Sequence, residues 1–247
     1  MCGRFVSTTT PADLVSLLGE FGWDSAETLA PSWNVAPTDP VSALLERVDK
    51  ETGELARRLR PLRWGLVPSW SKDASGAARL INARSETADQ KPSFRKAFAK
   101  RRCVLPADGY FEWRQVAAAE GRKAFKQPYF LTTGGVMLMA GLYEFWRDDA
   151  VPEHDPAAWL ATACILTRDA TDSAGRVHDR MPVVIAPEDL GLWLDPEVSD
   201  RAELHRLLHL PADGEVTVRA VSTAVNRVGT NGPELLAEVA DPLGIAD

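Results

Sequence analysis

Apolar residues recur along this chain mainly in short runs bounded by polar, proline or glycine residues. Runs of this kind that are rich in β-branched and aromatic side chains predict β-strands. The expected strands are 41–48, 57–67, 103–115, 128–132, 136–145, 159–167, 181–186 and 216–222. The Gly134-Gly135 pair, between two of these runs, predicts a hairpin turn.

Helical spacing of apolar residues occurs in fewer places. Thr10 precedes Pro11, and Asp13 occupies the third position after the expected cap, so a helix is predicted to begin here with a capping box. The apolar residues that follow at helical spacing are Leu14, Leu17, Leu18 and Phe21. Further helices are expected at 93–101, 187–195, 200–210 and 233–240.

Strands outnumber helices in this pattern and do not alternate with them regularly. That order predicts an α+β fold built on antiparallel strands and argues against a doubly wound parallel sheet. No Gly/Ser-rich linker divides the 247 residues, so we expect one domain over 1–247, with its core at about 2–230.

Composition adds few constraints. The apolar and charged fractions, 45% and 26%, are those of an ordinary globular protein. We see no stretch suited to crossing a bilayer and no basic, apolar secretory leader, so we expect a cytoplasmic protein with no membrane partner. Three cysteines, an odd number with no close pair, argue against a disulfide framework.

Charge is distributed unevenly. The whole chain has a formal net charge of −7, yet residues 57–102 contain 13 Lys or Arg and only 3 Asp or Glu. A concentrated basic segment favours a polyanionic partner. The alternative is that these cations form an ordinary solvated face.

Cys2 carries the most specific chemistry. If Met1 is removed, Cys2 presents an α-amine, with a pKa near ~8, and a thiol on one carbon skeleton. The amine can form an imine with an aldehyde, and the sulfur can then close a five-membered thiazolidine. The alternative is a small buried side chain, since free Cys is among the most buried residue types.

Aromatic side chains lie within the basic segment. Trp64 and Trp70 could stack on unpaired bases while neighbouring cations hold phosphates, as single-stranded nucleic acid requires. Arg84 has the planar fork that suits a phosphate. The alternatives are core positions for both tryptophans and an ion pair, for example with Glu86, for the arginine.

Two further side chains are suited to proton transfer. Glu112 lies between aromatic residues, and apolar surroundings raise a carboxyl pKa toward the range useful for acid–base catalysis. His178, flanked by Asp179 and Arg180, can exchange protons near neutral pH. A solvent-facing strand position for the glutamate and a structural role for the histidine remain alternatives. His205 and His209 have no obvious third ligand, so we expect no metal.

Seven short blocks follow one another in a fixed order. They are MCGR at 1–4, NVAPT at 34–38, WGLVPSW at 64–70, NARSET at 82–87, RCVLPADGYFEW at 102–113, AGLY at 140–143 and HDRMP at 178–182. Together they resemble the SRAP family, named for SOS response-associated peptidase. The pairs Val221-Ser222 and Val225-Asn226 also fit this pattern.

The resemblance implies a fold, an activity and a set of residues. It implies an open antiparallel barrel-like sheet flanked by helices, in a monomer without a cofactor. The implied activity is covalent trapping of abasic sites in single-stranded DNA, by a thiazolidine, with associated AP-lyase activity and N-terminal self-processing. The implied catalytic residues are Cys2, Asn82, Glu112 and His178. The implied DNA-binding residues are Arg4, Trp64, Trp70, Arg84, Trp113 and Arg180.

Three rival functions share some of these residues. A thiol peptidase would use Cys2, Glu112 and His178 as well, although only Met1 precedes Cys2 here. An N-terminal-nucleophile amidohydrolase, such as a glutamine amidotransferase, would use Cys2 but not the later blocks. A non-catalytic single-strand binder would need only the basic and aromatic residues.

Overall fold

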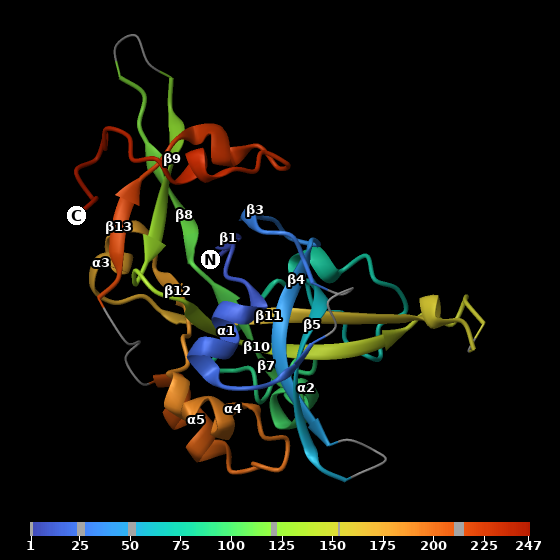
Figure 1. Ribbon diagram of the computed structural model, residues 1–247. Coiled ribbons are helices and arrows are strands. Elements are labelled where there is room, and N and C mark those ends of the chain that lie inside the picture. The colour runs from blue at the N-terminus through green and yellow to red at the C-terminus, as the bar shows by residue number, and fades with distance from the viewer. Residues whose placement is uncertain (1, 24–27, 49–52, 120–122, 153, 210–214) are drawn as a thin grey trace.

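The strands of the molecule form two sheets, with helices packed outside them (Figure 1). The computed structural model describes residues 2–23, 28–48, 53–119, 123–152, 154–209 and 215–247. The five-stranded sheet has the order β13 (Thr217–Ala220), β9 (Phe125–Thr132), β8 (Gly109–Val116), β1 (Arg4–Ser7) and β3 (Ser32–Val35). All its neighbouring strands pair antiparallel.

The larger sheet curls into a barrel. Its order is β12 (Arg180–Pro182), β11 (Trp159–Asp169), β10 (Met137–Arg147), β7 (Arg102–Ala107), β4 (Pro40–Val48), β5 (Leu55–Trp64) and β2 (Gly22–Trp23), and β6 (Asn82–Arg84) also pairs with β11. A two-residue parallel contact joins β5 to β11, and each of these strands lies one position in from an end of this order. Strands β5, β4, β7, β10 and β11 therefore form a ring.

Helices lie outside the sheets. The α-helices are α1 (Pro11–Leu18), α2 (Arg95–Lys100), α3 (Asp172–Val177), α4 (Leu190–Leu194) and α5 (Arg201–His209). The 3₁₀ turns are η2 (Ala77–Arg79), η3 (Pro156–Ala158), η4 (Pro187–Asp189), η5 (Thr223–Asn226) and η6 (Pro233–Leu236). No helix in the described ranges has the length and apolar character of a membrane span.

The expected α+β fold with a barrel-like antiparallel sheet is confirmed. The capping box at the start of α1 is present too, with Thr10 and Asp13 bonding to each other's backbone N–H groups. The run expected as one strand at 103–115 divides into β7 and β8, which belong to different sheets. Asp108 is the single residue between them.

Two local predictions are wrong. The Gly134-Gly135 pair does not make a hairpin, because β9 already lies between β13 and β8 while β10 lies between β11 and β7. The chain crosses there from one sheet to the other. The segment 233–240 is not an α-helix beyond the turn η6; instead Val221 bridges to Glu238, and the N–H of Val239 donates to the carbonyl of Ala220. Pairing with the sheet edge replaces helical bonding in this segment.

The main core fills the barrel and the space between it and the smaller sheet. Phe5 of β1 and Trp64 of β5 meet in an edge-to-face contact, with ring centroids 5.1 Å apart. Cys2 and Tyr110 belong to this same buried cluster. A second cluster, centred on Trp193 and Phe98, packs α2, α4 and α5 against the outside of the barrel. Cys2 and Phe5, near the start of the chain, are therefore part of the core.

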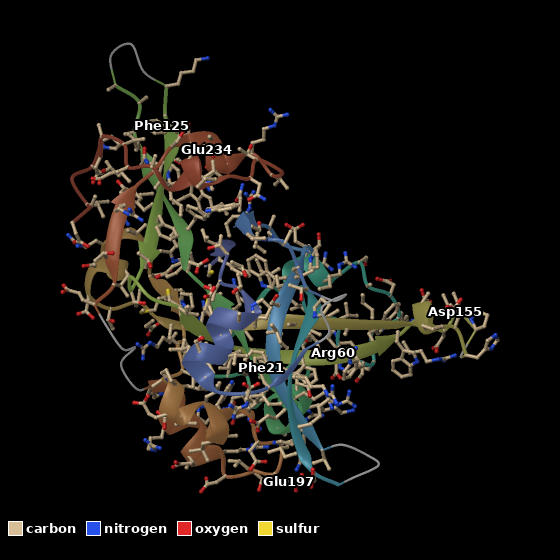
Figure 2. All side chains as sticks on the ribbon, in the orientation of Figure 1. Phe21, Arg60, Phe125, Asp155, Glu197 and Glu234 are labelled. Atoms are coloured by element: carbon tan, nitrogen blue, oxygen red, sulfur yellow. The ribbon has the colours of Figure 1, made fainter. Side chains whose placement is uncertain are left out.

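One hairpin extends away from the body of the molecule. Strands β10 and β11 continue beyond the barrel as a two-stranded arm, and Asp155 lies at its end (Figures 1 and 2). The indole of Trp146 on this arm donates to the carbonyl of Ser71 at 2.7 Å. The arm is thereby joined to the loop that follows the WGLVPSW block.

Replacing Asp108 by alanine should lower the free energy of unfolding by about 2–3 kcal/mol, because its carboxylate organises the segment after β1. It accepts from the Thr8 N–H at 2.6 Å, from the Thr8 hydroxyl at 2.8 Å and from the Thr9 hydroxyl at 2.6 Å. Urea unfolding measures the change. Asp149→Ala, at an exposed carboxylate on the arm, is the control and should alter stability by less than about 0.5 kcal/mol.

Candidate active site

The N-terminal segment is held inside the molecule by strand pairing. β1 lies between β3 and β8, with Phe5 opposite both Val35 and Tyr110. Cys2 lies two residues before the start of this strand and is fully buried. Its thiol lies 3.9 Å from the carbonyl oxygen of Arg4, to which it donates. The position of Cys2 is therefore set by a sheet, not by a free chain end.

Asn82 fixes the backbone of Cys2 from the other sheet. Its side-chain amide donates to the carbonyl oxygen of Cys2 at 2.8 Å. Asn82 itself is positioned by the parallel pairing of β6 with β11, opposite Ile165. The side-chain oxygen of Asn82 is buried and has no hydrogen-bond partner among the described residues. It can accept a hydrogen bond from a group that enters this space.

Glu112 is the acidic group of the site. It lies on β8, is only 3% exposed, and burial raises the pKa of its carboxyl, an effect that the charge of His178 opposes. Burial, followed by the charge of Glu112, also raises the pKa of the Cys2 thiol well above its ordinary value. Glu112 therefore lies within electrostatic range of both Cys2 and His178, and its protonated form is favoured.

His178 follows α3 and is partly exposed, at 29% of its side chain. Its Nδ1 accepts the backbone N–H of Arg180 at 3.0 Å and lies 2.7 Å from a carboxylate oxygen of Asp179. A neutral ring can accept from the N–H, whereas a protonated ring can donate to the carboxylate. Each protonation state thus has a partner, which is what a proton shuttle requires.

An open cavity of about 540 Å³ borders this group. His178 and Asp179 form one side of it, and three residues of β8 that directly follow Glu112 form the other. These residues are Trp113, Arg114 and Gln115. The cavity gives His178 access to solvent.

Two of the residues expected to contact DNA are exposed. Trp70 is 60% exposed beside a cavity of about 270 Å³, whose lining also includes Arg79. Arg84 is exposed on β6, on the same face as Asn82, because alternate residues of a strand point the same way. Both side chains are available to a ligand outside the protein.

The other four expected DNA contacts have partners inside the protein. Trp64 is fully buried and its indole donates to the carbonyl of Ile81, so the structure favours the core alternative. Arg4 donates hydrogen bonds to the side chain of Asn34 and to the carbonyl of Val225. The indole of Trp113 donates to the side chain of Asn226. Arg180 forms ion pairs with Glu86 and Asp169. In this conformation these four support the site from inside.

The family model described as SOS response associated peptidase (SRAP) matches residues 1–228. The chain belongs to the SRAP family. This SRAP protein is 33% identical over 236 residues to the abasic site processing protein YoqW of Bacillus subtilis, with 96% of this chain and 99% of YoqW covered. It is 29% identical to the abasic site processing protein HMCES of Pongo abelii, with 97% of this chain and 76% of HMCES covered.

Solved structures share the fold of this SRAP protein. A protein from Bacteroides thetaiotaomicron superposes with a TM-score of 0.77 at 24% identity, covering 97% of this chain and all of the other. A phage-related protein from Bordetella bronchiseptica gives a TM-score of 0.63 at 29% identity, covering 89% of this chain and 94% of the other. The architecture described above is therefore that of experimentally determined proteins.

The sequence motifs of this SRAP protein did not reveal every residue around Cys2. Tyr110 lies on the same face of β8 as Glu112, two residues away, and is fully buried. Arg114 and Gln115 line the cavity, although they follow the recognisable block at 102–113. The two-residue period of β8 after Gly109 would have placed Tyr110 beside Glu112 had the strand boundary been known.

Glu112→Gln should increase the free energy of unfolding at neutral pH relative to the unchanged protein. Burial raises the folded-state pKa of Glu112, so the folded state retains a proton that the unfolded chain releases. Stability is then lost as the pH rises from the ordinary carboxyl value of about 4.3 through the folded-state pKa. Chemical unfolding between pH 4 and pH 8 should show a difference that grows with pH. A constant difference, or one that also appears with the exposed Glu188→Gln control, contradicts this account.

Proposed function

We propose that this protein traps abasic sites in single-stranded DNA by forming a thiazolidine between the damaged sugar and Cys2, once Met1 has been removed. The observation that carries the proposal is the hydrogen bond from Asn82 to Cys2, with Glu112 in electrostatic range of both Cys2 and His178. The names of YoqW and HMCES support the choice of abasic DNA as the substrate.

The first covalent step joins nitrogen to carbon. An abasic deoxyribose in its open form carries an aldehyde at C1′, and the Cys2 amine attacks that carbon to give a carbinolamine. The protonated carboxyl of Glu112, favoured by the raised pKa of this group, donates a proton to the departing hydroxyl. Water leaves, the Glu112 carboxylate takes the proton from the resulting iminium nitrogen, and a neutral imine links the sugar to Cys2.

The second step closes the ring. The Cys2 sulfur donates an electron pair to the imine carbon, a C–S bond forms, and the electron pair of the C=N bond moves to nitrogen. The proton lost by the thiol is replaced on that nitrogen, because Glu112 can give its own proton to the nitrogen and take the one that the thiol releases. No redox equivalent is needed, so the residues in place are sufficient for the balance of atoms and charge.

His178 is the proton shuttle of this scheme. It borders the open cavity, where it can help the sugar ring to open and the crosslink to reverse. At the imine stage it can also remove a proton from C2′, after which the C3′–O bond breaks and the phosphate leaves. AP-lyase activity is therefore a side branch of the same intermediate.

The removal of Met1 is part of the proposal. The nitrogen of Cys2 is an amide while Met1 is attached, and Cys2 then has no exposed surface. Only cleavage of that bond produces the amine that attacks the sugar. Cleavage by the protein itself would account for the peptidase in the family description.

The DNA strand is proposed to cross the exposed residues near the site. Arg84 lies on β6 two residues from Asn82, and its guanidinium is suited to a phosphate. Trp70 presents a ring on which an unpaired base can stack. The buried Trp64 and Arg180 hold the segments that carry Asn82 and His178.

Untagged protein incubated with an abasic single-stranded oligonucleotide should give a shifted band on a denaturing gel. Cys2→Ala should reduce this band at least 100-fold, because the sulfur that closes the ring is lost and an unclosed imine hydrolyses under the conditions of the gel. Cys164→Ala, at another fully buried free cysteine, is the matched control and should leave the band intact.

Mass spectrometry of the active protein should find it without Met1, and a variant that retains an extra N-terminal residue should not crosslink. Crosslinking by Cys2→Ala, or by protein that retains Met1, would overturn the proposal. Equal DNA affinity of all variants with no crosslink would instead favour a non-catalytic binder.

Non-covalent binding of intact single-stranded DNA should separate the two exposed residues. Arg84→Ala should reduce the slope of log affinity against log salt by about 1, because one phosphate contact is lost. Trp70→Ala should weaken binding by about 1–3 kcal/mol and leave that slope unchanged, because stacking is largely independent of salt. Fluorescence anisotropy at several salt concentrations measures both.

Arg201→Ala, at an exposed position on α5, serves as the control for general charge effects. If it changes the slope as much as Arg84→Ala does, then Arg84 has no specific place in the DNA path.

A further inference from the structure

The hydroxyl of Tyr110 lies buried in the core without a hydrogen-bond partner among the described residues. Such a group loses its hydrogen bonds to water on folding and gains none in return, which destabilises the folded state. Tyr129, on the neighbouring strand β9, shows the ordinary arrangement, since its hydroxyl donates to Asp241 at 2.6 Å. Packing alone gives no reason for the oxygen of Tyr110, because phenylalanine would fill nearly the same volume without the cost.

Strand geometry places Tyr110 on the same face of β8 as Glu112, within the buried cluster that contains the proposed reacting group. Tyr110 and Glu112 alternate onto one face of β8, and Tyr110 is paired across the sheet with Phe5 of β1. Tyr110 and Cys2 belong to the same buried cluster. Burial, followed by the charges of Cys2 and Glu112, raises the pKa of Tyr110 well above its ordinary value, so the phenol remains protonated and is a donor.

No group among the described residues donates a hydrogen bond to the sulfur of Cys2. Its one described hydrogen bond is donated to the carbonyl of Arg4, which favours the thiol over the thiolate. The side-chain amide of Asn82 is occupied by the carbonyl of Cys2. Glu112 adds negative charge beside the sulfur when it is ionised. As the thiol loses its proton, negative charge develops on the sulfur. An uncharged group that donates a hydrogen bond to the sulfur would stabilise this charge.

We propose that the Tyr110 hydroxyl donates a hydrogen bond to the Cys2 sulfur while that sulfur adds to the imine carbon. Tyr110 keeps its own proton throughout, whereas the thiol proton passes to the imine nitrogen as the C–S bond forms. Tyr110 is thus a positioning residue for ring closure and is not needed for imine formation. This inference rests on the proposed function.

Tyr110→Phe removes only the oxygen atom, and two measurements separate the two steps. Borohydride added at short times reduces the imine and reports its formation, whereas a gel without borohydride reports the closed ring. Imine formation should stay within about twofold, while ring closure should slow by about tenfold, the effect of one hydrogen bond of about 1.4 kcal/mol. The pH at which closure is half-maximal should also rise, because the thiolate has lost its donor.

Two comparisons complete the test. Tyr129→Phe removes a hydroxyl bonded to Asp241 and should change neither step. Introducing 3,5-difluorotyrosine at position 110 keeps the shape of the ring and strengthens the donor, so closure should be at least as fast as in the unchanged protein. This variant also tests the inference if Tyr110→Phe does not fold.

Equal closure rates for the Tyr110→Phe and unchanged proteins would overturn the inference and leave the proposed function standing. Slowing of both steps together with a lower melting temperature would also overturn it, since that pattern is one of packing. If the unchanged protein forms an imine but never a closed ring, the proposed thiazolidine itself fails.

Discussion

The site depends on one constraint, the pairing of β1 between β3 and β8. Strand pairing continues to Arg4, so Cys2 cannot move freely although it is the second residue of the chain. The hydrogen bond from Asn82 to the carbonyl of Cys2 completes this restraint from the barrel side. Residues near chain ends are usually the least ordered part of a domain, whereas Cys2 is built into the core. If Cys2 is the nucleophile, as proposed, much of the entropy cost of positioning it is met during folding.

Buried charge around the site has a structural cost that neighbouring groups offset. Arg180 is buried, yet its guanidinium meets Glu86 at 2.7 Å and Asp169 at 2.5 Å, and its backbone N–H meets His178. One residue therefore joins three chain segments around the histidine. Burial is the main influence on the pKa of Glu112 and raises it, which shifts the carboxyl toward the protonated form that the proposed chemistry uses. Arg180 and Glu112, whose burial is energetically unfavourable, both lie in the region where proton transfer is proposed.

Much of the fold was predictable from the sequence, because strand-like runs and the Thr10 capping box are local features. The places where prediction failed depend on long-range pairing. The Gly134-Gly135 pair predicts a hairpin between β9 and β10. Each of these strands instead pairs with two other strands of its own sheet. The residues 233–240 have helical spacing but pair with the edge of β13.

The candidate site was only partly predictable for the same reason. Local sequence could flag Cys2, Glu112 and His178 by their chemistry, but it could not show that a tryptophan in a basic segment is buried, as Trp64 is. Nor could it show that 13 basic residues between 57 and 102 serve different roles. Arg102 is buried among backbone carbonyls, and Arg57 pairs with Glu46. Tertiary contacts decide which cations remain available to DNA.

The most direct measurement of the central claim is peptide mass spectrometry of nuclease-trimmed protein after reaction with abasic DNA. The account predicts that the sugar remnant lies on the peptide that begins at Cys2. In that peptide the α-amine should not be acylated, and the sulfur of Cys2 should not react with iodoacetamide. The account would be contradicted by a sugar remnant on a lysine or on Cys103. It would also be contradicted if iodoacetamide still alkylated the Cys2 sulfur of the crosslinked peptide.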